Sequence, residues 1–249
     1  MTREKSPKSD LEQLAISSME KLRLNTYPGR GIVMGFNKQG DQAIQIYWVM
    51  GRSENSRNRI LVQEGNVVKT KPFDASKVKD PTLIIYTAMK EVRGGHLVSN
   101  GDQTDSIAQI IEKGGTFGEG LRERTYEPDA PNFTPRITGE YSSESESPFF
   151  ILSIIRKDPF SDRPIHNLQL YKPESGTGKC IHTYEGDGNP LPSFKLDPYL
   201  VTLEGSIDQI AQTFWDLLNA ENRVALAVKG VDIRTGKVDF KIINQLGNK

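Results

Sequence analysis

The sequence contains a single cysteine, Cys180, which excludes a disulfide within the chain and a metal site built on paired cysteines. Its three histidines, His96, His166 and His182, lie far apart and lack the HExxH spacing of zinc hydrolases. The GxxxxGK[ST] phosphate loop and the GxSxG nucleophile elbow are also missing. The sequence therefore gives no positive sign of a metal hydrolase, a kinase, an ATPase or an esterase.

Charge of one sign and long apolar runs are also lacking. The 32 lysines and arginines balance the 32 aspartates and glutamates, so no global basic field attracts nucleic acid or anionic lipid. Residues 1–10 have no apolar segment behind their charges, which argues against a secretory signal. The longest apolar run, 149–155, is far shorter than the roughly 20 residues of a membrane helix. We expect a cytoplasmic protein that binds neither nucleic acid nor a membrane.

The pattern of apolar residues predicts an α+β protein. Helical spacing over residues 10–24 follows the capping-box pair Ser9 and Glu12. The stretches 32–34 and 43–50 predict a hairpin whose second strand is covered on both faces. Strands come in runs with helices clustered between them, which favours a sheet sandwich flanked by helices over a doubly wound fold. Further strands are expected at 96–99, 136–140, 149–156, 167–171, 179–184, 224–228 and 238–243, and helices at 80–89, from Thr104 or Asp105 through Ile111, after Thr116, and at 207–218.

Arginines are concentrated directly after the predicted strand 43–50. Arg52, Arg57 and Arg59 lie in the segment GRSENSRNR. Loops at strand ends carry binding groups on a rigid scaffold, and guanidinium groups bind phosphate-like anions in a bidentate manner. A solvated turn with arginines paired to surface acids is an equally good interpretation of the composition. Two further candidates are Arg30, which follows a Pro-Gly pair, and Arg136, at the start of a predicted strand.

A polar turn, residues 99–105, joins a predicted strand to a predicted helix. Its Asn100-Gly101 pair is most often a simple tight turn. Backbone NH groups at a helix start also bind anions or carbonyl oxygens. Because Asp102 and Asp105 are negative, the segment suits ribose hydroxyls or a base edge better than a phosphate. We interpret it as a candidate small-molecule pocket.

Two more segments offer titratable side chains. Residues 126–136 hold three prolines, which impose an extended path, and present Glu127 and Asp129. Taken alone, this segment is more typical of an ordinary surface connection. His182 is a possible catalytic base, although a lone histidine beside a strand is usually structural or exposed.

Taken together, these segments resemble the archaeal-type IMP cyclohydrolases, which catalyse the last step of inosinate synthesis without a cofactor. Each block alone is weak, but their order and spacing make the resemblance specific. The matching blocks are YPGR (27–30), GRSENSRNR (51–59), LIIY (83–86), VSNGDQTD (98–105), YEPD (126–129), TPRI (134–137) and HTYE (182–185).

The resemblance implies an Ntn-hydrolase-like four-layer αββα sandwich that does not process itself. Cys180 on a late strand and Thr2 in a polar arm are both poorly placed to be a terminal nucleophile. The implied reaction closes 5-formamidoimidazole-4-carboxamide ribotide to IMP with loss of water. It uses orientation, oxyanion donors and a carboxylate proton relay, and neither a metal nor a cofactor.

The resemblance also implies roles for particular residues. Arg59 and Tyr86 match positions that serve in catalysis, and we assign them to oxyanion stabilisation and proton delivery. Glu127 matches the acidic position and is the candidate proton relay. The expected substrate-binding residues are Arg30, Arg52, Asn58, Ser99, Asn100, Gly101, Asp102, Thr104 and Arg136.

The chain departs from the family in its N-terminal arm, residues 1–26, which precedes a single domain over residues 27–249. The helix in this arm could cap the pocket, mediate homo-oligomerisation or do neither. An amidohydrolase or cyclase acting on another purine-like ribotide would keep the same blocks. A non-catalytic nucleotide-binding protein that uses the arginines for affinity alone is the remaining alternative.

Overall fold

The computed structural model describes residues 10–78, 84–143 and 148–247. Its helices in these ranges are α1 (Asp10–Leu24), α2 (Glu54–Arg57), α3 (Gln103–Glu112), α4 (Phe117–Arg122) and α5 (Ile207–Leu217), with a short 3-10 turn at Ala75–Lys77. The strands are β1 (Gly31–Phe36), β2 (Gln42–Met50), β3 (Arg59–Glu64), β4 (Val67–Pro72), β5 (Thr87–Val92), β6 (Gly95–Ser99), β7 (Arg136–Ser142), β8 (Phe149–Lys157), β9 (Pro164–Tyr171), β10 (Thr177–His182), β11 (Tyr199–Thr202), β12 (Arg223–Asp232) and β13 (Val238–Asn244).

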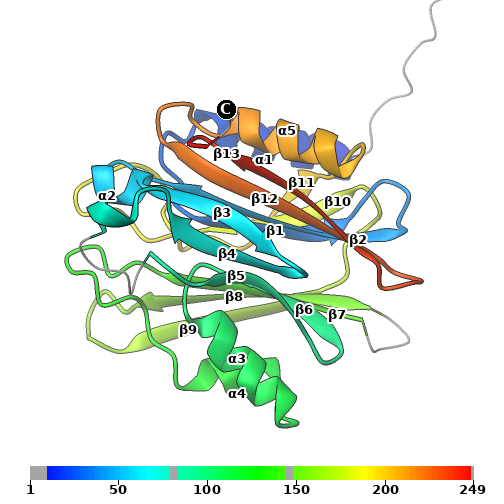
Figure 1. Cartoon of the computed structure of the whole chain (residues 1–249), viewed down its shortest axis with the longest axis horizontal. Helices are drawn as coiled ribbons and strands as arrows, with labels where there is room; N and C mark the ends of the chain where they lie inside the picture. The colour runs from blue at the N-terminus through cyan, green and yellow to red at the C-terminus, as the bar shows by residue number, and fades with distance from the viewer. Residues whose placement is uncertain (1–9, 79–83, 144–147, 248–249) are drawn as a thin grey trace, which may run out of the picture.

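The strands in the described ranges form two antiparallel sheets. One has six strands in the order β11-β10-β1-β2-β12-β13, and the other has seven in the order β3-β4-β5-β6-β7-β8-β9. Figure 1 shows the two sheets face to face, with α1 and α5 outside the six-stranded sheet and α3 and α4 outside the seven-stranded one. This α+β sandwich is the class that the clustered strands predicted. None of the helices in the described ranges is long and apolar enough to cross a membrane.

Strand β2 illustrates how the layers are held together. Ile44, Ile46 and Trp48 on one face pack with α1 and α5, whereas Tyr47 and Val49 on the other face join the core between the sheets. Every residue of β2 after Gln42 is buried, as the nearly continuous apolar sequence predicted. A third apolar cluster lies between α3, α4 and the seven-stranded sheet. Met19 and Leu22 anchor α1 to the six-stranded sheet.

Most predicted elements are confirmed: helices α1, α4 and α5, the β1–β2 hairpin, and strands β6 to β10, β12 and β13. The predicted helix at 80–89 is wrong over its second half. Residues from Thr87 onward form strand β5, which pairs with β4 and β6. This pairing between distant segments overrides the local helical spacing. Asp80 and Pro81, the proposed start of that helix, lie outside the described residues.

Other details also differ from the sequence predictions. Helix α3 begins after Asp102 rather than at Thr104 or Asp105, and Asp102 forms no side-chain cap. The Thr104 hydroxyl instead bonds with Ser99, and Asp105 accepts a hydrogen bond from Thr87. Strands β3, β4 and β11 and the one-turn helix α2 were not predicted from the sequence. Strand β3 is the edge strand of its sheet and β4 lies next to it, and both are partly exposed, so they lack a clear apolar pattern.

Candidate active site

A cavity of about 390 Å³ opens at one end of the sandwich, a volume typical of small-molecule sites. In the antiparallel six-stranded sheet, the start of β1 lies beside the ends of β2 and β10. Arg30 precedes β1, Arg52 follows β2 and Tyr184 follows β10. Arg59, the first residue of β3, completes the wall from the other sheet. The residues that line the cavity include Tyr27, Gly29, Arg30, Arg52, Arg59, Glu127, Asp129, Thr134 and Tyr184.

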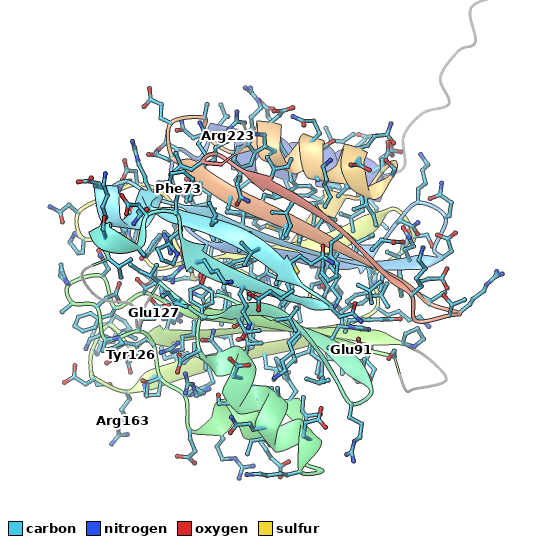
Figure 2. The ribbon with its side chains drawn as sticks, viewed as in Figure 1. Phe73, Glu91, Tyr126, Glu127, Arg163 and Arg223 are labelled. Atoms are coloured by element: carbon cyan, nitrogen blue, oxygen red, sulfur yellow. The ribbon has the colours of Figure 1, made fainter. Side chains whose placement is uncertain are left out.

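Arg30 and Glu127 form a buried ion pair in the cavity wall. Arg30 Nη2 donates to Glu127 Oε2 over 2.9 Å, and the two residues are 9% and 2% exposed. Glu127 comes from the proline-rich segment after α4, at the same end of the sheets as α2 (Figure 2). Burial raises the pKa of the Glu127 carboxyl, and Arg30 offsets only part of this effect. A carboxylate with a raised pKa is suited to exchanging protons near neutral pH.

Gly29 sets the position of Arg30. Its backbone has φ of +75°, and a Cβ atom there would lie 2.2 Å from Thr183 Oγ1. Glycine alone satisfies both conditions without strain. The close approach lets the Arg30 backbone NH donate to Thr183 Oγ1 over 3.1 Å. The Pro-Gly pair noted in the sequence therefore fixes where the Arg30 side chain enters the cavity.

Arg59 lines the cavity without an acidic partner. It is 6% exposed, and its guanidinium donates to the backbone carbonyls of Ser56 and Met50 over 2.8 and 3.2 Å. Within the described ranges, no carboxylate lies at ion-pair distance from it. A buried cation is stable only if an opposite charge or hydrogen bonds compensate it. Arg59 is thus placed to receive an anion from the cavity.

Arg52 and two tyrosines form the opposite wall. The Arg52 guanidinium lies 4.7 Å from the ring centre of Tyr27, which stacks on Tyr184 with centroids 6.0 Å apart. Arg52 also pairs with Asp187 and is partly exposed. Tyr184 hydrogen-bonds through its hydroxyl to Thr134, whose hydroxyl also bonds Asp129. Burial raises the pKa of Tyr184 to about 12, so its phenol is neutral at physiological pH.

A pair of tyrosines joins the two sheets beside the cavity. The Tyr47 hydroxyl, on β2, lies 2.5 Å from the hydroxyl of Tyr86, which precedes β5. Both residues are buried, and burial raises the pKa of Tyr47 well above its ordinary value. Arg30 lies close enough to both phenols to interact with them electrostatically. Tyr86 is thus adjacent to the cavity but does not line it.

The 99–104 turn lies behind Arg30. Asn100 accepts a hydrogen bond from Arg30 Nη1 through its backbone carbonyl over 3.2 Å. Its side chain bonds Pro135, Ile137 and Gln103, so its polar atoms are already engaged. Ser99 and Thr104 bond to each other and to the Gly101 carbonyl. The turn thus supports Arg30 from behind and contributes no side chain to the cavity lining.

The remaining predicted residues also lie outside the lining. Arg136 pairs with Asp102 over 2.7 Å. The Asn58 side chain donates to the backbone carbonyl of Asp74 and accepts from the backbone NH of the same residue. His182 is buried and faces a different cavity. In the described part of the chain, no group of three or more His, Cys, Asp or Glu side chains is placed to hold a metal ion.

Comparisons with known proteins identify the family of the chain. The sequence model of the IMP cyclohydrolase-like protein family matches residues 27–236. The chain belongs to this family. A relative named IMP cyclohydrolase from Methanothrix thermoacetophila is 32% identical over 77% of this chain and 86% of its own length. Relatives with the same name from Methanopyrus kandleri and Haloquadratum walsbyi are 30% and 27% identical, over 67% and 77% of this chain and 79% and 84% of their own lengths.

Membership in the IMP cyclohydrolase-like family confirms the resemblance drawn from the sequence blocks. The family match begins at Tyr27, so helix α1 precedes it. Of the residues predicted for the site, Arg30, Arg52, Arg59 and Glu127 converge on the cavity. Tyr47 was not predicted as part of this region, because a tyrosine in a buried strand has the pattern of an ordinary core residue. The one feature of the sequence that pointed beyond packing was the phenol hydroxyl of Tyr47, because a buried hydroxyl needs a hydrogen-bond partner.

Proposed function

We propose that this protein is an IMP cyclohydrolase that closes 5-formamidoimidazole-4-carboxamide ribotide to IMP in the cavity around Arg59. The observation that carries the proposal is the convergence of Arg30, Arg52, Arg59 and Glu127 on one cavity in a member of this family. A ribotide needs cations for its phosphate and a proton acceptor at its reacting end. These side chains supply both.

The ring closure requires two protons to move. The carboxamide nitrogen attacks the formyl carbon, the carboxamide and formamido nitrogens each lose one proton, and the formyl oxygen leaves as water. Glu127 is the group we assign to relaying these protons. Burial raises the pKa of Glu127 and brings it closer to neutral pH than the pKa of an exposed glutamate, so the carboxylate takes up and releases protons more readily at that pH. Arg30 holds the carboxylate in one orientation through the 2.9 Å hydrogen bond.

Negative charge builds on the formyl oxygen as the new bond forms. We assign Arg59 to this charge because its guanidinium lacks a carboxylate partner among the described residues and faces the cavity. A donor aimed at a developing oxyanion lowers the activation barrier by roughly 3 kcal/mol. Arg52, at the more exposed rim beside Tyr27, is then the phosphate ligand.

Tyr86 acts beside these groups in our proposal. Its hydroxyl is tied to Tyr47, and the pair lies within electrostatic reach of Arg30. We assign Tyr86 to delivering a proton toward the leaving oxygen, with Tyr47 fixing the phenol. Asn58, Ser99, Asn100, Gly101, Asp102, Thr104 and Arg136 stay predicted substrate-binding residues on the strength of the resemblance alone.

We also infer that the sandwich is of the Ntn-hydrolase type without self-processing. Two face-to-face antiparallel sheets with helices on both outer faces support this assignment. Cys180 is buried on β10 and burial raises its pKa to about 12, which makes it a poor nucleophile. Thr2 lies outside the described residues. A cytoplasmic location and homo-oligomerisation stay predictions.

The deciding experiment is a direct assay. The purified protein is treated with a chelator, incubated with the formylated ribotide, and followed for IMP. We expect IMP to form far above the spontaneous rate, and Arg59→Ala to lose most of the activity. Absence of ring closure would refute the proposal. Saturable IMP binding without turnover would then identify a nucleotide-binding protein, and hydrolysis of the ribotide an amidohydrolase.

A further inference from the structure

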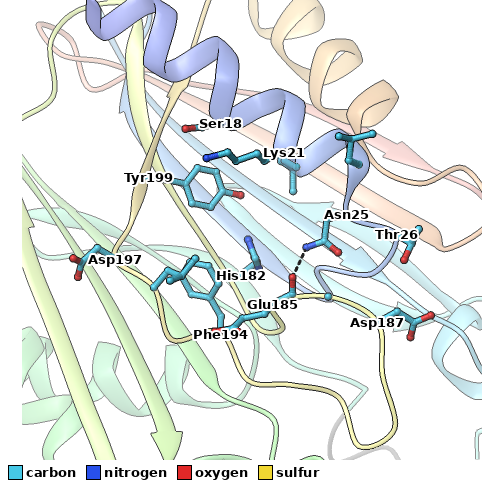
Figure 3. A pocket seen from close by; sticks show the side chains of 14 residues that line it. Ser18, Lys21, Asn25, Thr26, His182, Glu185, Asp187, Phe194, Asp197 and Tyr199 are labelled. Carbon is cyan, nitrogen blue, oxygen red and sulfur yellow. Dashed lines mark hydrogen bonds between the residues drawn. The ribbon is translucent and has the colours of Figure 1, made fainter.

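A different cavity, of about 670 Å³, lies between helix α1 and the chain after β10 (Figure 3). Leu22 and Leu24 of α1 form one wall, and His182, Phe194 and Tyr199 form the other. It shares no lining residue with the cavity around Arg59. Since α1 precedes the segment that matches the family, part of this cavity is built by residues outside the family match.

His182 leaves one polar atom available in this cavity. The residue is 5% exposed, and its Nδ1 lies 2.8 Å from the carbonyl oxygen of Tyr184. A carbonyl oxygen only accepts, so Nδ1 carries the hydrogen. Burial lowers the pKa of His182 to about 4, so the ring is neutral at pH 7 and Nε2 is a bare acceptor. Nε2 has no hydrogen-bond partner among the described residues and is not sealed from the cavity.

The walls beside His182 are aromatic. The ring centroids of His182 and Phe194 lie 4.2 Å apart, and those of His182 and Tyr199 lie 5.7 Å apart. Figure 3 shows these three rings together below α1. Flat rings pack favourably against such surfaces through stacked or edge contacts. The cavity is therefore suited to a planar ligand that brings a hydrogen-bond donor to Nε2.

Charge at the rim disfavours an anionic ligand. Glu185 and Asp197 line the cavity with a single lysine, Lys21. Asp187 is also present, but its charge is paired with Arg52. The remaining balance is one negative charge, in contrast to the arginines of the other cavity. A phosphorylated ribotide would therefore be repelled here, whereas a neutral ring would not.

We propose that this cavity is a binding site for a neutral, flat heteroaromatic molecule of nucleobase to nucleoside size that donates a ring N–H to His182 Nε2. The ligand packs against the rings of Phe194 and Tyr199, which are tilted by 59° to each other, and is covered by α1. Binding at this site does not rest on the proposed cyclohydrolase activity, because none of its lining residues takes part in that reaction.

Two isosteric probes test the donor. Indole carries a ring N–H, and benzofuran has the same shape without it. By isothermal titration of the full chain, we expect indole to bind at least about tenfold more tightly, as one lost hydrogen bond to a buried acceptor implies. Equal affinities, or no binding of indole, would overturn the proposal.

Spectroscopy and variants locate the probe. The chain has three histidines, so protein labelled with ¹⁵N-histidine gives a small set of imidazole signals. Indole should shift the Nε2 resonance of His182 and leave those of His96 and His166 unchanged; the reverse pattern refutes the site.

Variants provide a second test of the location. His182→Phe should reduce indole binding to the level of benzofuran, and Arg59→Ala should leave indole binding unchanged. Displacement of indole by IMP would place the probe in the other cavity and overturn the proposal.

Discussion

The carboxylate of Glu127 and the guanidinium of Arg30 meet over 2.9 Å although 97 residues separate them in the chain. Neither side chain has much contact with solvent. Removing one partner of such a pair leaves an uncompensated buried charge, which costs about 3–5 kcal/mol. The pair is therefore both a structural bond between two loops and, in our proposal, the proton-handling group of the site.

Glu127→Gln tests the proton relay. Glutamine still accepts a hydrogen bond from Arg30 but takes up no proton at physiological pH. We expect kcat to fall by about a hundredfold or more, the usual contribution of a general acid or base, with little change in KM.

The pH profile provides the control for Glu127. Because burial raises the pKa of Glu127, wild-type activity should decline on the acidic side at a pH above the ordinary range of a glutamate. The variant should lose this acidic limb. An unchanged limb in Glu127→Gln would assign it to another group.

Arg59→Ala tests the unpaired cation. We expect turnover to fall by about a hundredfold or more, as for the loss of one oxyanion donor. Arg57→Ala is the matched control, because Arg57 comes from the same segment and does not line the cavity. It should stay close to the wild type in steady-state kinetics. Equal losses in the two variants would show a general effect of charge rather than a specific contact.

Tyr86→Phe and Tyr47→Phe separate a reacting phenol from a supporting one. Each removes one of the two hydroxyl groups that lie 2.5 Å apart. We expect Tyr86→Phe to lower kcat more than it raises KM, and Tyr47→Phe to have a smaller effect in the same direction. A change in KM alone for Tyr86→Phe would mean that the residue contributes to binding only.

Lys229→Met tests a buried amine in the core between the sheets. Lys229 is 0% exposed, and its Nζ lies 2.9 Å from His96 Nδ1. Burial destabilises the charged amine and therefore lowers its pKa from 10.5 to about 8. At pH 7 this cost to the stability of the folded state is present in full. Near pH 10 the amine is neutral in the folded state, and most of the cost is gone. At about 1.4 kcal/mol per pKa unit, the difference between 10.5 and about 8 corresponds to about 3.5 kcal/mol. Subtracting about 1 kcal/mol for the lost hydrogen bond, we expect the free energy of unfolding of the variant to rise by about 2.5 kcal/mol at pH 7.

Chemical denaturation at two pH values checks the sign of this effect. The gain in free energy of unfolding should be largest at neutral pH and mostly disappear at pH 10, where the native lysine is neutral in the folded state. A gain of equal size at both pH values would attribute the effect to packing by methionine instead.

Much of the fold could be predicted because its signals are local. The capping box of α4 and the nearly continuous apolar sequence of β2 depend on neighbouring residues alone. Strand β5 could not be predicted in the same way, since Thr87 to Val92 are fixed by pairing with β4 and β6. The local spacing there pointed to a helix.

The charged residues of the candidate site could be predicted from the sequence, and its uncharged ones mostly could not. Arg30 and Arg59 stood out as arginines beside predicted strands, whereas Glu127 was identified by the resemblance of its segment to the family. The position of the 99–104 turn was not predictable, because its side chains satisfy one another and only the Asn100 carbonyl reaches Arg30. Tyr47 was hidden by its strand, which is buried on both faces.

The hydrogen bond between the buried Tyr47 and Tyr86 hydroxyls joins β2 to the chain just before β5, beside the cavity but outside its lining. A directional bond between phenols tolerates less sliding than packed methyl groups, so it ties the two sheets together beside the cavity. A cavity wall that moves little favours rigid, flat ligands over flexible ones, because a preorganised ligand loses less conformational freedom on binding.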